Sequence, residues 1–384
     1  ASFANVGSDA PLYSLGSTYE SAYFGQWYEA NSQAIQFPYR GQAGYMASNS
    51  LGNPNLKPEM TTDTEFGMDL RFFRGRLKLD FGVYNRTTKD QIYATPVPSG
   101  TGYTSMVRNA GEISNKGTEL SIEAIPFESN DFTWTIRANY GKNKSEVVEL
   151  APGVTRLYIA GYSWPSIQIE KEHGYGVIFG YGYKRNDNNE YLIGSDGWPI
   201  VADGQVVIGE IQPDWLGNFL TNFRYKNHTV SALIDIRRGG DVLNFNLNYT
   251  IRAGTAKITE DRGSTHVWPG VNETTGQKNT VELTKDRTFY TRYGLQHENQ
   301  VEDGSFVKLR ELAYSYRFPQ SIVEKTPFSS LSFNLSGRNL WIDTDFSMGD
   351  PEANFMGTDN GSQAYYWWTP PPTKSYNFGL DIGL

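Results

Sequence analysis

The sequence predicts an all-β protein, a transmembrane antiparallel β-barrel, and three observations support this fold class. Segments of about ten residues alternate apolar and polar side chains, as strands between lipid and a wet lumen do. Very short turns and long loops follow each other along the chain. The last segment, residues 375–384, alternates without a fault. Repeated strands of this kind are typical of outer-membrane barrels.

Residues 61–86 form the clearest predicted unit, a β-hairpin with one apolar and one polar face. Apolar side chains fall at every second position in both arms, and the pattern breaks only at Arg74 and Gly75. The apolar positions are Phe66, Met68, Leu70 and Phe72 in the first arm and Leu77, Leu79, Phe81 and Val83 in the second. Successive side chains on a strand point to opposite faces, so each arm has one apolar face. Both arms exceed the five or so residues usual in soluble sheets.

Other segments repeat this pattern and bring the total to about ten strands. They cover residues 2–7, 107–127, 132–141, 214–226, 229–238, 306–318, 331–341 and 375–384. The first is short and looks like the end of a strand. The alternation over 306–318 shifts near Arg310, which indicates a β-bulge.

The connections between these strands alternate in length. Tight turns are predicted near Gly75, Asn130, Asn227 and Glu324. Long irregular segments are predicted over 9–60, 95–106, 148–213, 239–304 and 343–373. In outer-membrane barrels the periplasmic turns are short and the extracellular loops are long. We therefore expect all the tight turns on one side of the membrane and the long loops on the other.

The same alternation predicts which side chains line the barrel lumen. The lumen-lining candidates are Glu65, Asp69, Arg71, Glu119, Glu123, Arg137 and Asp381. Phe66, Leu70, Leu79, Ile122, Ile136 and Phe378 should face lipid instead. Paired carboxylates such as Glu119 and Glu123 lie on the polar face of one strand, which indicates a wet lumen wall rather than a catalytic pair.

Composition and motifs argue against several other classes of protein. The net charge of −8 disfavours a nucleic-acid partner, which would select a basic surface. The four histidines lack metal-type spacing and there is no cysteine, so we predict no metal site. The chain contains no phosphate-binding loop, no serine nucleophile elbow and no zinc-protease motif. We therefore predict neither an enzyme nor a bound cofactor.

Aromatic residues in the long loops are the tentative substrate-binding candidates. They are Trp164, Trp198, Trp268, Tyr365, Tyr366, Trp367 and Trp368. Flat aromatic faces could stack on sugar rings or hold peptide side chains. The alternative is that these residues pack the loops against one another, and we favour that alternative for any single one. Trp134 and Trp341 belong to predicted strands, where an interfacial aromatic belt is expected.

Several stretches together resemble the SusC/RagA-like group of TonB-dependent outer-membrane transporters. The resemblance rests on ASFANVGSDAP at the start, NPNLKPEMTTDTEFG (53–67), NAGEISNKGTELSIEAIP (109–126), IGEIQPDWLGNF with YKNHTVSALIDIRRGGDV (208–242), DGSFVKLRELAYSYRFP (303–319), LSGRNLWI (335–342) and the terminal PTKSYNFGLDIGL. It spans nearly the whole chain. The motif NPNLKPE alone occurs in TonB-dependent receptors generally. The later motifs, in this order, are specific to the SusC/RagA-like group.

The resemblance implies a barrel of 22 strands with an N-terminal plug domain. Residues 1–384 correspond to the C-terminal part of that barrel, from about the thirteenth strand, and the plug and first barrel half are absent from this chain. It further implies three kinds of partner: a SusD-like surface lipoprotein that acts as a lid, TonB contacting the missing N-terminal region, and the remaining half of the barrel with its plug. The barrel would cross the outer membrane of a Gram-negative bacterium many times, in contact with lipid.

The implied function is active import of nutrient oligomers, either a glycan or a peptide, energised through TonB. Two alternatives share some of the same features. A passive porin or an adhesin barrel would share the strands but would need neither lid nor plug. A soluble carbohydrate-binding β-sandwich would share the loop aromatics but would dissolve without detergent.

Overall fold

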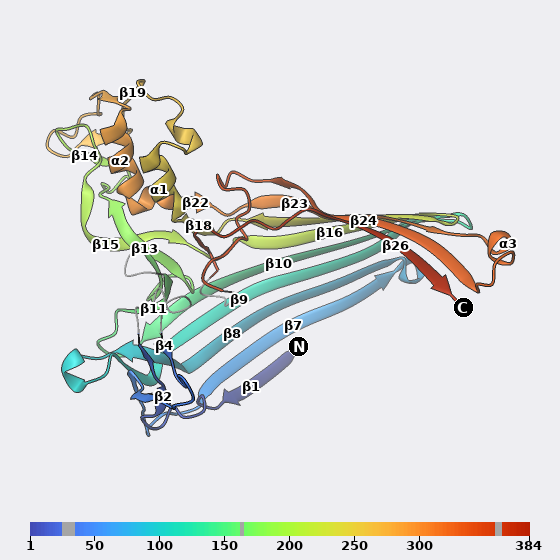
Figure 1. The fold of residues 1–384 in the computed structure, drawn as a ribbon, viewed down its shortest axis with the longest axis horizontal. Helices are drawn as coiled ribbons and strands as arrows, with labels where there is room; N and C mark the ends of the chain where they lie inside the picture. The colour runs from blue at the N-terminus through green and yellow to red at the C-terminus, as the bar shows by residue number, and fades with distance from the viewer. Residues whose placement is uncertain (25–34, 162–164, 358–362) are drawn as a thin grey trace.

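Ten strands form one continuous, curved antiparallel sheet (Figure 1). The computed structural model describes residues 1–24, 35–161, 165–357 and 363–384. In sheet order the strands are β1 (Ser2–Ser8), β7 (Glu59–Phe72), β8 (Leu77–Pro96), β9 (Ser105–Glu128), β10 (Phe132–Leu150), β16 (Trp215–Tyr225), β17 (His228–Arg238), β23 (Phe306–Arg317), β24 (Ser330–Asp343) and β26 (Ser375–Gly383). The short strand β6 (Ser50–Leu51) adds a parallel pairing with β9. The predicted antiparallel strands and their number are confirmed.

The strand register places the polar positions of neighbouring strands on the same face. In the first hairpin Asp69 pairs with Asp80, and Lys78 on β8 pairs with Glu123 on β9. The Glu123 carboxylate also bridges strands, accepting from Lys78 Nζ at 2.8 Å and from Arg137 Nε at 3.0 Å. The opposite charges of Lys78, Glu123 and Arg137 on three adjacent strands stabilise this register modestly. The apolar residues of the same strands, such as Leu70, alternate with them and occupy the other face.

All four short turns lie along one rim of the sheet (Figure 1). Backbone hydrogen bonds join neighbouring turns, from Ile125 N to Arg76 O at 2.7 Å and from Lys226 N to Asp131 O at 2.6 Å. The last of these turns contains the short helix α3 (Gln320–Val323). In the first turn the backbone reverses direction through three successive residues with positive φ, Phe73, Arg74 and Gly75 (φ 85°). The predicted alternation of short and long connections is therefore confirmed.

Aromatic side chains gather on the apolar face close to the short turns. The ring of Trp134 stacks on that of Phe223 at 5.4 Å, and Phe127 contacts Phe132 at 5.5 Å. Further along, His228 packs against Tyr316 at 4.7 Å between ring centroids. Aromatic girdles of this kind mark the interface between lipid and water in outer-membrane barrels.

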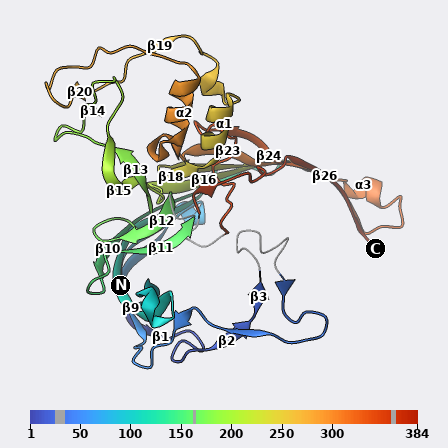
Figure 2. The same ribbon diagram turned by 60° about the vertical axis from the view of Figure 1, so that its left-hand side comes forward.

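The long segments are not irregular as predicted, because they fold into a layer over the opposite rim (Figure 2). Within 148–213, strands β11 (Arg156–Gly161), β12 (Ser166–Glu170), β13 (Val177–Tyr183) and β15 (Val201–Glu210) form a four-stranded sheet. Helices α1 (Asn246–Ala253) and α2 (Arg287–Leu295) fold from 239–304, and β18 (Asp241–Asn244) pairs with both β22 (Val301–Asp303) and β25 (Tyr365–Tyr366). These elements are too short to show a periodic pattern in the sequence, so packing between distant segments determines their structure. In the described part of the chain, no helix has the length and apolar character needed to cross a bilayer.

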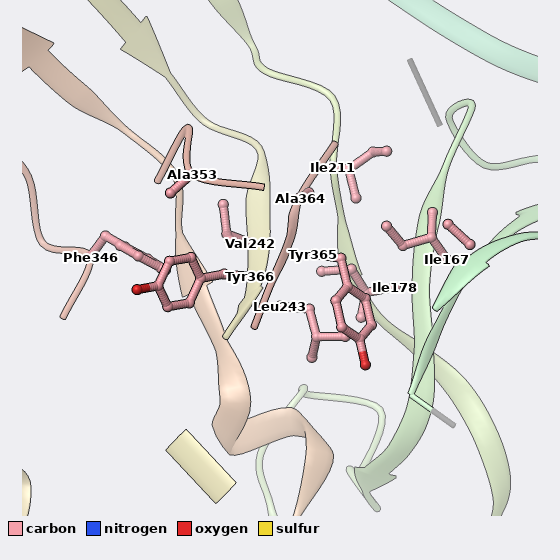
Figure 3. Packing of buried hydrophobic residues seen from close by; sticks show 11 residues of the cluster. Ile167, Ile178, Ile211, Val242, Leu243, Phe346, Ala353, Ala364, Tyr365 and Tyr366 are labelled. Atoms are coloured by element: carbon pink, nitrogen blue, oxygen red, sulfur yellow. The ribbon is translucent and has the colours of Figure 1, made fainter. Parts of the chain in front are cut away.

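One apolar cluster of this loop layer draws residues from three of the long segments, 148–213, 239–304 and 343–373 (Figure 3). Tyr365 is fully buried beside Ile167, Ile178 and Leu243, which come from β12, β13 and β18. A second cluster is mostly aromatic and joins α1 and α2 to Trp198 and Trp268. These cores fix the loop layer in one arrangement above the sheet, because interdigitated side chains transmit position.

Candidate functional site

A cavity of about 1400 Å³ lies between the polar face of the sheet and the loop layer. Its floor is formed by strands β7 to β10, β16 and β17, which contribute Glu65, Asp80 and Glu119 among others. Its upper wall includes Tyr175, Gln212 and Glu352 from the long segments. Large, mostly preformed cavities with a few polar groups are the usual sites for ligands.

Three of the predicted lumen-lining residues, Glu65, Asp69 and Glu119, line this cavity. Arg71 and Arg137 lie on the same polar face nearer the short turns, and each forms an ion pair there, with Asp69 at 2.9 Å and with Glu123 at 3.0 Å. Asp381 lies on β26, where its carboxylate accepts hydrogen bonds from Asn334 and Ser332. The structure thus places the predicted residues on one polar face, and their contact with cargo stays a prediction.

Glycines keep the floor of the cavity recessed. Gly82 on β8 and Gly141 on β10 both line it, and a Cβ atom added to either would have no heavy atom within 4 Å. The space in front of these glycines is therefore open. A strand interior gains no packing from glycine, so such positions often mark close approach of a ligand or another chain.

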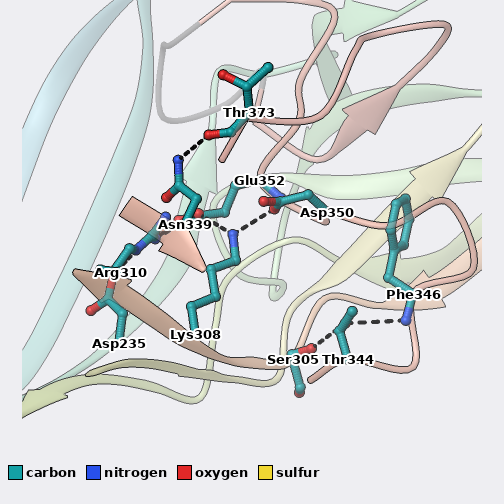
Figure 4. A network of polar contacts seen from close by, with 10 residues as sticks. All are labelled: Asp235, Ser305, Lys308, Arg310, Asn339, Thr344, Phe346, Asp350, Glu352 and Thr373. Carbon is teal, nitrogen blue, oxygen red and sulfur yellow. Dashed lines mark hydrogen bonds and ion pairs between the residues drawn. The ribbon is translucent and has the colours of Figure 1, made fainter. Parts of the chain in front are cut away.

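The cavity is bordered by a network of charged side chains around the buried Lys308, which we call the charge clamp (Figure 4). Lys308 on β23 is 3% exposed, and its ammonium contacts the carboxylates of Asp350, at 2.6 Å, and of Glu352. Arg310 bridges from Glu352, at 2.6 Å, to Asp235 on β17, at 2.8 Å. The clamp therefore ties the segment 344–357 to two strands of the sheet.

The β-bulge predicted near Arg310 is confirmed, because Leu309 and Glu311 pair with the adjacent residues Ile234 and Leu233 of β17 and leave Arg310 as the extra residue. The register between β23 and β24 shifts between Leu309 and Glu311, and Asn339 opposite has a positive φ of 52°. A bulge places an extra residue in one strand and redirects side chains locally. Lys308 and Arg310 lie two residues apart on β23, and both contact Glu352.

Burial and ion pairing shift the pKa of the acidic groups around the clamp in opposite directions. Burial alone would raise the pKa of Glu352, but hydrogen bonds from Lys308 and Arg310 outweigh it and lower the pKa. Burial dominates at Glu302, whose pKa is raised although Asn244 and Ser347 donate hydrogen bonds to it. Glu352 is thus held in its charged form by its two basic partners.

The predicted loop aromatics divide into buried and exposed residues. Trp198 and Trp268 lie in the aromatic cluster, 8% and 7% exposed, and Tyr365 and Tyr366 lie in the apolar cluster. Trp367 packs against the apolar cluster, whereas the neighbouring Trp368 is 61% exposed. Trp164 lies outside the described residues. Burial of four of these side chains agrees with the packing role that the sequence favours, and their contact with substrate is untested.

Sequence reasoning did not identify the clamp acids Asp350 and Glu352, nor Tyr249 beside Trp368. The shift in apolar–polar alternation near Arg310 was a sequence signal for the basic half of the clamp, on β23. Its acidic partners lie about 40 residues away in a segment without periodicity, so no local pattern could connect them. Tyr249 belongs to a helix that the sequence did not predict.

His297 is buried between β13 and α2, where the backbone N–H of Tyr181 donates to its Nδ1 atom at 3.2 Å. Burial lowers its pKa from 6.5 to about 4. Since the unfolded state binds the proton more readily, stability should fall as pH drops from 6.5 towards 4, by on the order of 2–3 kcal/mol.

Urea unfolding of the loop layer, followed by tryptophan fluorescence at pH 7 and pH 4.5, checks this expectation. His297→Gln should lose much of the pH dependence, whereas His173→Gln, at an exposed histidine, should keep it. Equal pH dependence in wild type and His297→Gln would contradict the assignment.

Comparisons with known proteins bear on this arrangement of sheet, cavity and loop layer. A family profile described as "TonB dependent receptor-like, beta-barrel" matches residues 2–340. TonB-dependent receptor P3 of Formosa agariphila is 29% identical over 357 residues, covering 87% of this chain and 33% of that protein. TonB-dependent receptor SusC of Bacteroides thetaiotaomicron is 33% identical over 153 residues, covering 39% of this chain and 14% of its own length.

Solved structures show the same fold. The RagAB peptide importer in its closed-closed state superposes with a TM-score of 0.70 at 19% identity, covering 99% of this chain and 40% of that chain. Its open-open state gives a TM-score of 0.67 at 20% identity, covering 100% of this chain and 39% of that chain. At this identity the likeness concerns the fold alone. The chain spans about a third of the length of the long-matching curated relatives.

Proposed function

This chain belongs to the TonB-dependent receptor-like β-barrel family, and from that premise we propose that it forms the C-terminal part of the barrel of an outer-membrane importer. The family and the single ten-strand sheet contradict the alternative of a soluble β-sandwich. In the described sheet β1 pairs only with β7, and β26 pairs only with β24. Unpaired backbone groups in lipid cost several kcal/mol each, so strands of the remaining barrel half would pair with both edges.

The imported cargo we propose is a nutrient oligomer, a glycan or a peptide. The observation that carries this proposal is the large cavity between a polar sheet face and a folded loop layer. The floor offers carboxylates and recessed glycines, and the upper wall offers tyrosine and amide groups. Such a lining is too wet for a lipid and roomy enough for several linked monomers.

A SusD-like surface lipoprotein is the proposed lid, and TonB the proposed source of energy, acting through a plug that lies outside this chain. Exposed apolar side chains support a partner on the loop side. Leu12, Tyr13, Tyr19 and Tyr45 in the segments 9–24 and 35–47 are all at least 70% exposed. Exposed apolar groups concentrated in one region commonly mark protein interaction sites.

The proposed location is the outer membrane of a Gram-negative bacterium, crossed many times by the strands, as is usual for this family of outer-membrane receptors. The short turns would face the periplasm and the loop layer the outside. We propose no catalytic role. Among the described residues, no group of three or more histidine, cysteine or acidic side chains is arranged to hold a metal ion.

Uptake by cells that carry the whole protein tests the importer against a passive porin or an adhesin. We expect accumulation of labelled glycan or peptide oligomers that stops when TonB is deleted or the inner membrane is de-energised. A passive porin would let oligomers equilibrate equally well without TonB. An adhesin would bind them at the surface without accumulation, and either result would refute the proposal.

A further inference from the structure

Two aromatic side chains on the loop layer, Tyr249 and Trp368, form an exposed pair that we call the aromatic platform. Tyr249 lies on α1 and is 43% exposed, and Trp368 follows β25 and is 61% exposed. Their ring centroids are 6.2 Å apart and the ring planes are inclined by 43°. The pair joins two segments about 120 residues apart in the sequence, so tertiary structure alone creates it.

The platform is rigidly held from below. The backbone N–H of Trp368 donates to Oδ1 of the buried Asn246 at 3.0 Å. Phe245 packs edge-on against both Tyr249, at 5.8 Å, and Trp367, at 5.8 Å. Three consecutive prolines, at positions 370–372, stiffen the chain that leaves the platform. Both rings are therefore presented by a fixed scaffold rather than by a loose loop.

Presentation of Trp368 has a conformational cost. Its φ is 48°, a left-handed backbone value that bulky residues rarely adopt. Such conformations persist where the surrounding structure fixes them, and they are concentrated at ligand-binding and catalytic sites. The neighbouring Trp367 packs against the apolar cluster, whereas the ring of Trp368 points out to solvent.

Neither platform residue lines the cavity of about 1400 Å³, and neither belongs to the buried clusters. The other loop tryptophans with described burial differ in this respect, since Trp198 and Trp268 are buried and Trp367 is partly packed. A packing role therefore explains those residues but leaves the platform unexplained. Two exposed rings side by side offer flat apolar faces to a ligand.

We propose that the aromatic platform is a binding subsite for the sugar rings of an oligosaccharide, which rests on the importer function and names a glycan as its cargo. A pyranose ring has an apolar C–H face that can cover an aromatic ring, and hydroxyl groups around its edge. Arg252 lies three residues after Tyr249 on the same side of α1, and its Nη1 atom donates to Asn248 Oδ1 at 3.1 Å. Charged and amide groups are thus at hand for the hydroxyls.

A peptide fits the platform less well. Peptide side chains are usually gripped in concave pockets or by pairing with a strand edge. The platform is an open pair of rings outside the cavity, which suits the broad face of a sugar better than an inserted side chain. We therefore assign the oligosaccharide as the ligand and make peptide binding an outcome of the test.

Binding to the purified whole transporter in detergent tests the assignment. The probes are malto-, cello-, xylo- and fructo-oligosaccharides, with a tryptic peptide mixture as the second arm. At least one sugar series should bind, and Trp368→Ala and Tyr249→Ala should each weaken it about five- to tenfold. Trp368→Phe should keep most of the affinity because it keeps an aromatic face. Leu295→Ala, which removes another half-exposed apolar side chain from the loop layer, should change nothing.

Three results would overturn the proposal: no sugar binds the wild type, sugar affinity is unchanged in Trp368→Ala, or only peptide binding is lost in that variant. Near-native thermal stability of Trp368→Ala and Tyr249→Ala excludes misfolding as the cause of weaker binding. Energy-dependent uptake, measured in parallel, separates this proposal from the importer function. Uptake that is equal in wild type and Trp368→Ala refutes the subsite alone, whereas platform-dependent binding without any uptake supports the subsite and refutes the importer.

Discussion

Lys308→Ala is expected to detach the segment 344–357 from the sheet and to destabilise this part of the loop layer by about 3–5 kcal/mol. The Lys308–Asp350 ion pair is largely buried, and removing one partner of a buried pair leaves the other uncompensated at a cost of this size. In the wild type, Lys308 is almost fully buried and neutralises Asp350 and Glu352 together. Without it, two carboxylates face each other beside the cavity with only Arg310 to balance them.

Hydrogen exchange of the backbone amides in 344–357 measures this effect directly in the purified protein. We expect much faster exchange in Lys308→Ala, and partial recovery when Lys308→Met is combined with Glu352→Gln, because fewer charges then remain unpaired. Lys325→Ala, at an exposed lysine on the short-turn rim, is the matched control and should leave exchange unchanged. Unaltered protection in Lys308→Ala would show that the apolar cluster alone holds this segment.

Leu70→Arg is expected to destabilise the folded barrel by roughly 2–4 kcal/mol, since it places a charge on the lipid face. Leu70 pairs with Leu79 on the apolar face of the first hairpin. The neighbouring Asp69 points to the polar face, where its ion pair with Arg71 is exposed to solvent. Exposed pairs contribute little, so Asp69→Leu should cost less than about 1 kcal/mol.

Urea-dependent folding of the whole protein into lipid vesicles, read by the heat-modifiable shift of folded barrels on gels, compares the two variants. The pair acts as its own control because the two positions are adjacent and the changes are opposite in polarity. A Leu70→Arg protein that folds like wild type, together with a failing Asp69→Leu protein, would mean that the strand register is off by one residue.

The long strands could be predicted because their information is local. A period of two residues assigns every side chain of β7 and β8 to a face, and the break at Arg74 and Gly75 fixes the turn. The same reasoning located the bulge at Arg310, since a bulge shifts the alternation within one strand. Neighbouring strands then pair in sequence order, which leaves little for distant contacts to decide.

The loop layer could not be predicted in the same way. The sheet of β11, β12, β13 and β15 and the helices α1 and α2 are short elements. Their apolar residues form a core only when distant segments meet, as three long segments do around Tyr365. Short elements of this kind are marginal alone and depend on tertiary packing for stability. The sequence therefore showed long loops and gave no sign of their fold.

The candidate site also has one part that the sequence predicts and one part that it does not. The sequence by itself determined the polar face that carries Glu65, Asp69 and Glu119, because alternation along a strand is a covalent property of an extended backbone. It could not decide that Trp367 packs inward while Trp368 turns out to meet Tyr249, or that Lys308 meets Glu352. Only the tertiary structure decided those contacts, because each depends on the free energy of packing between segments that the sequence keeps far apart.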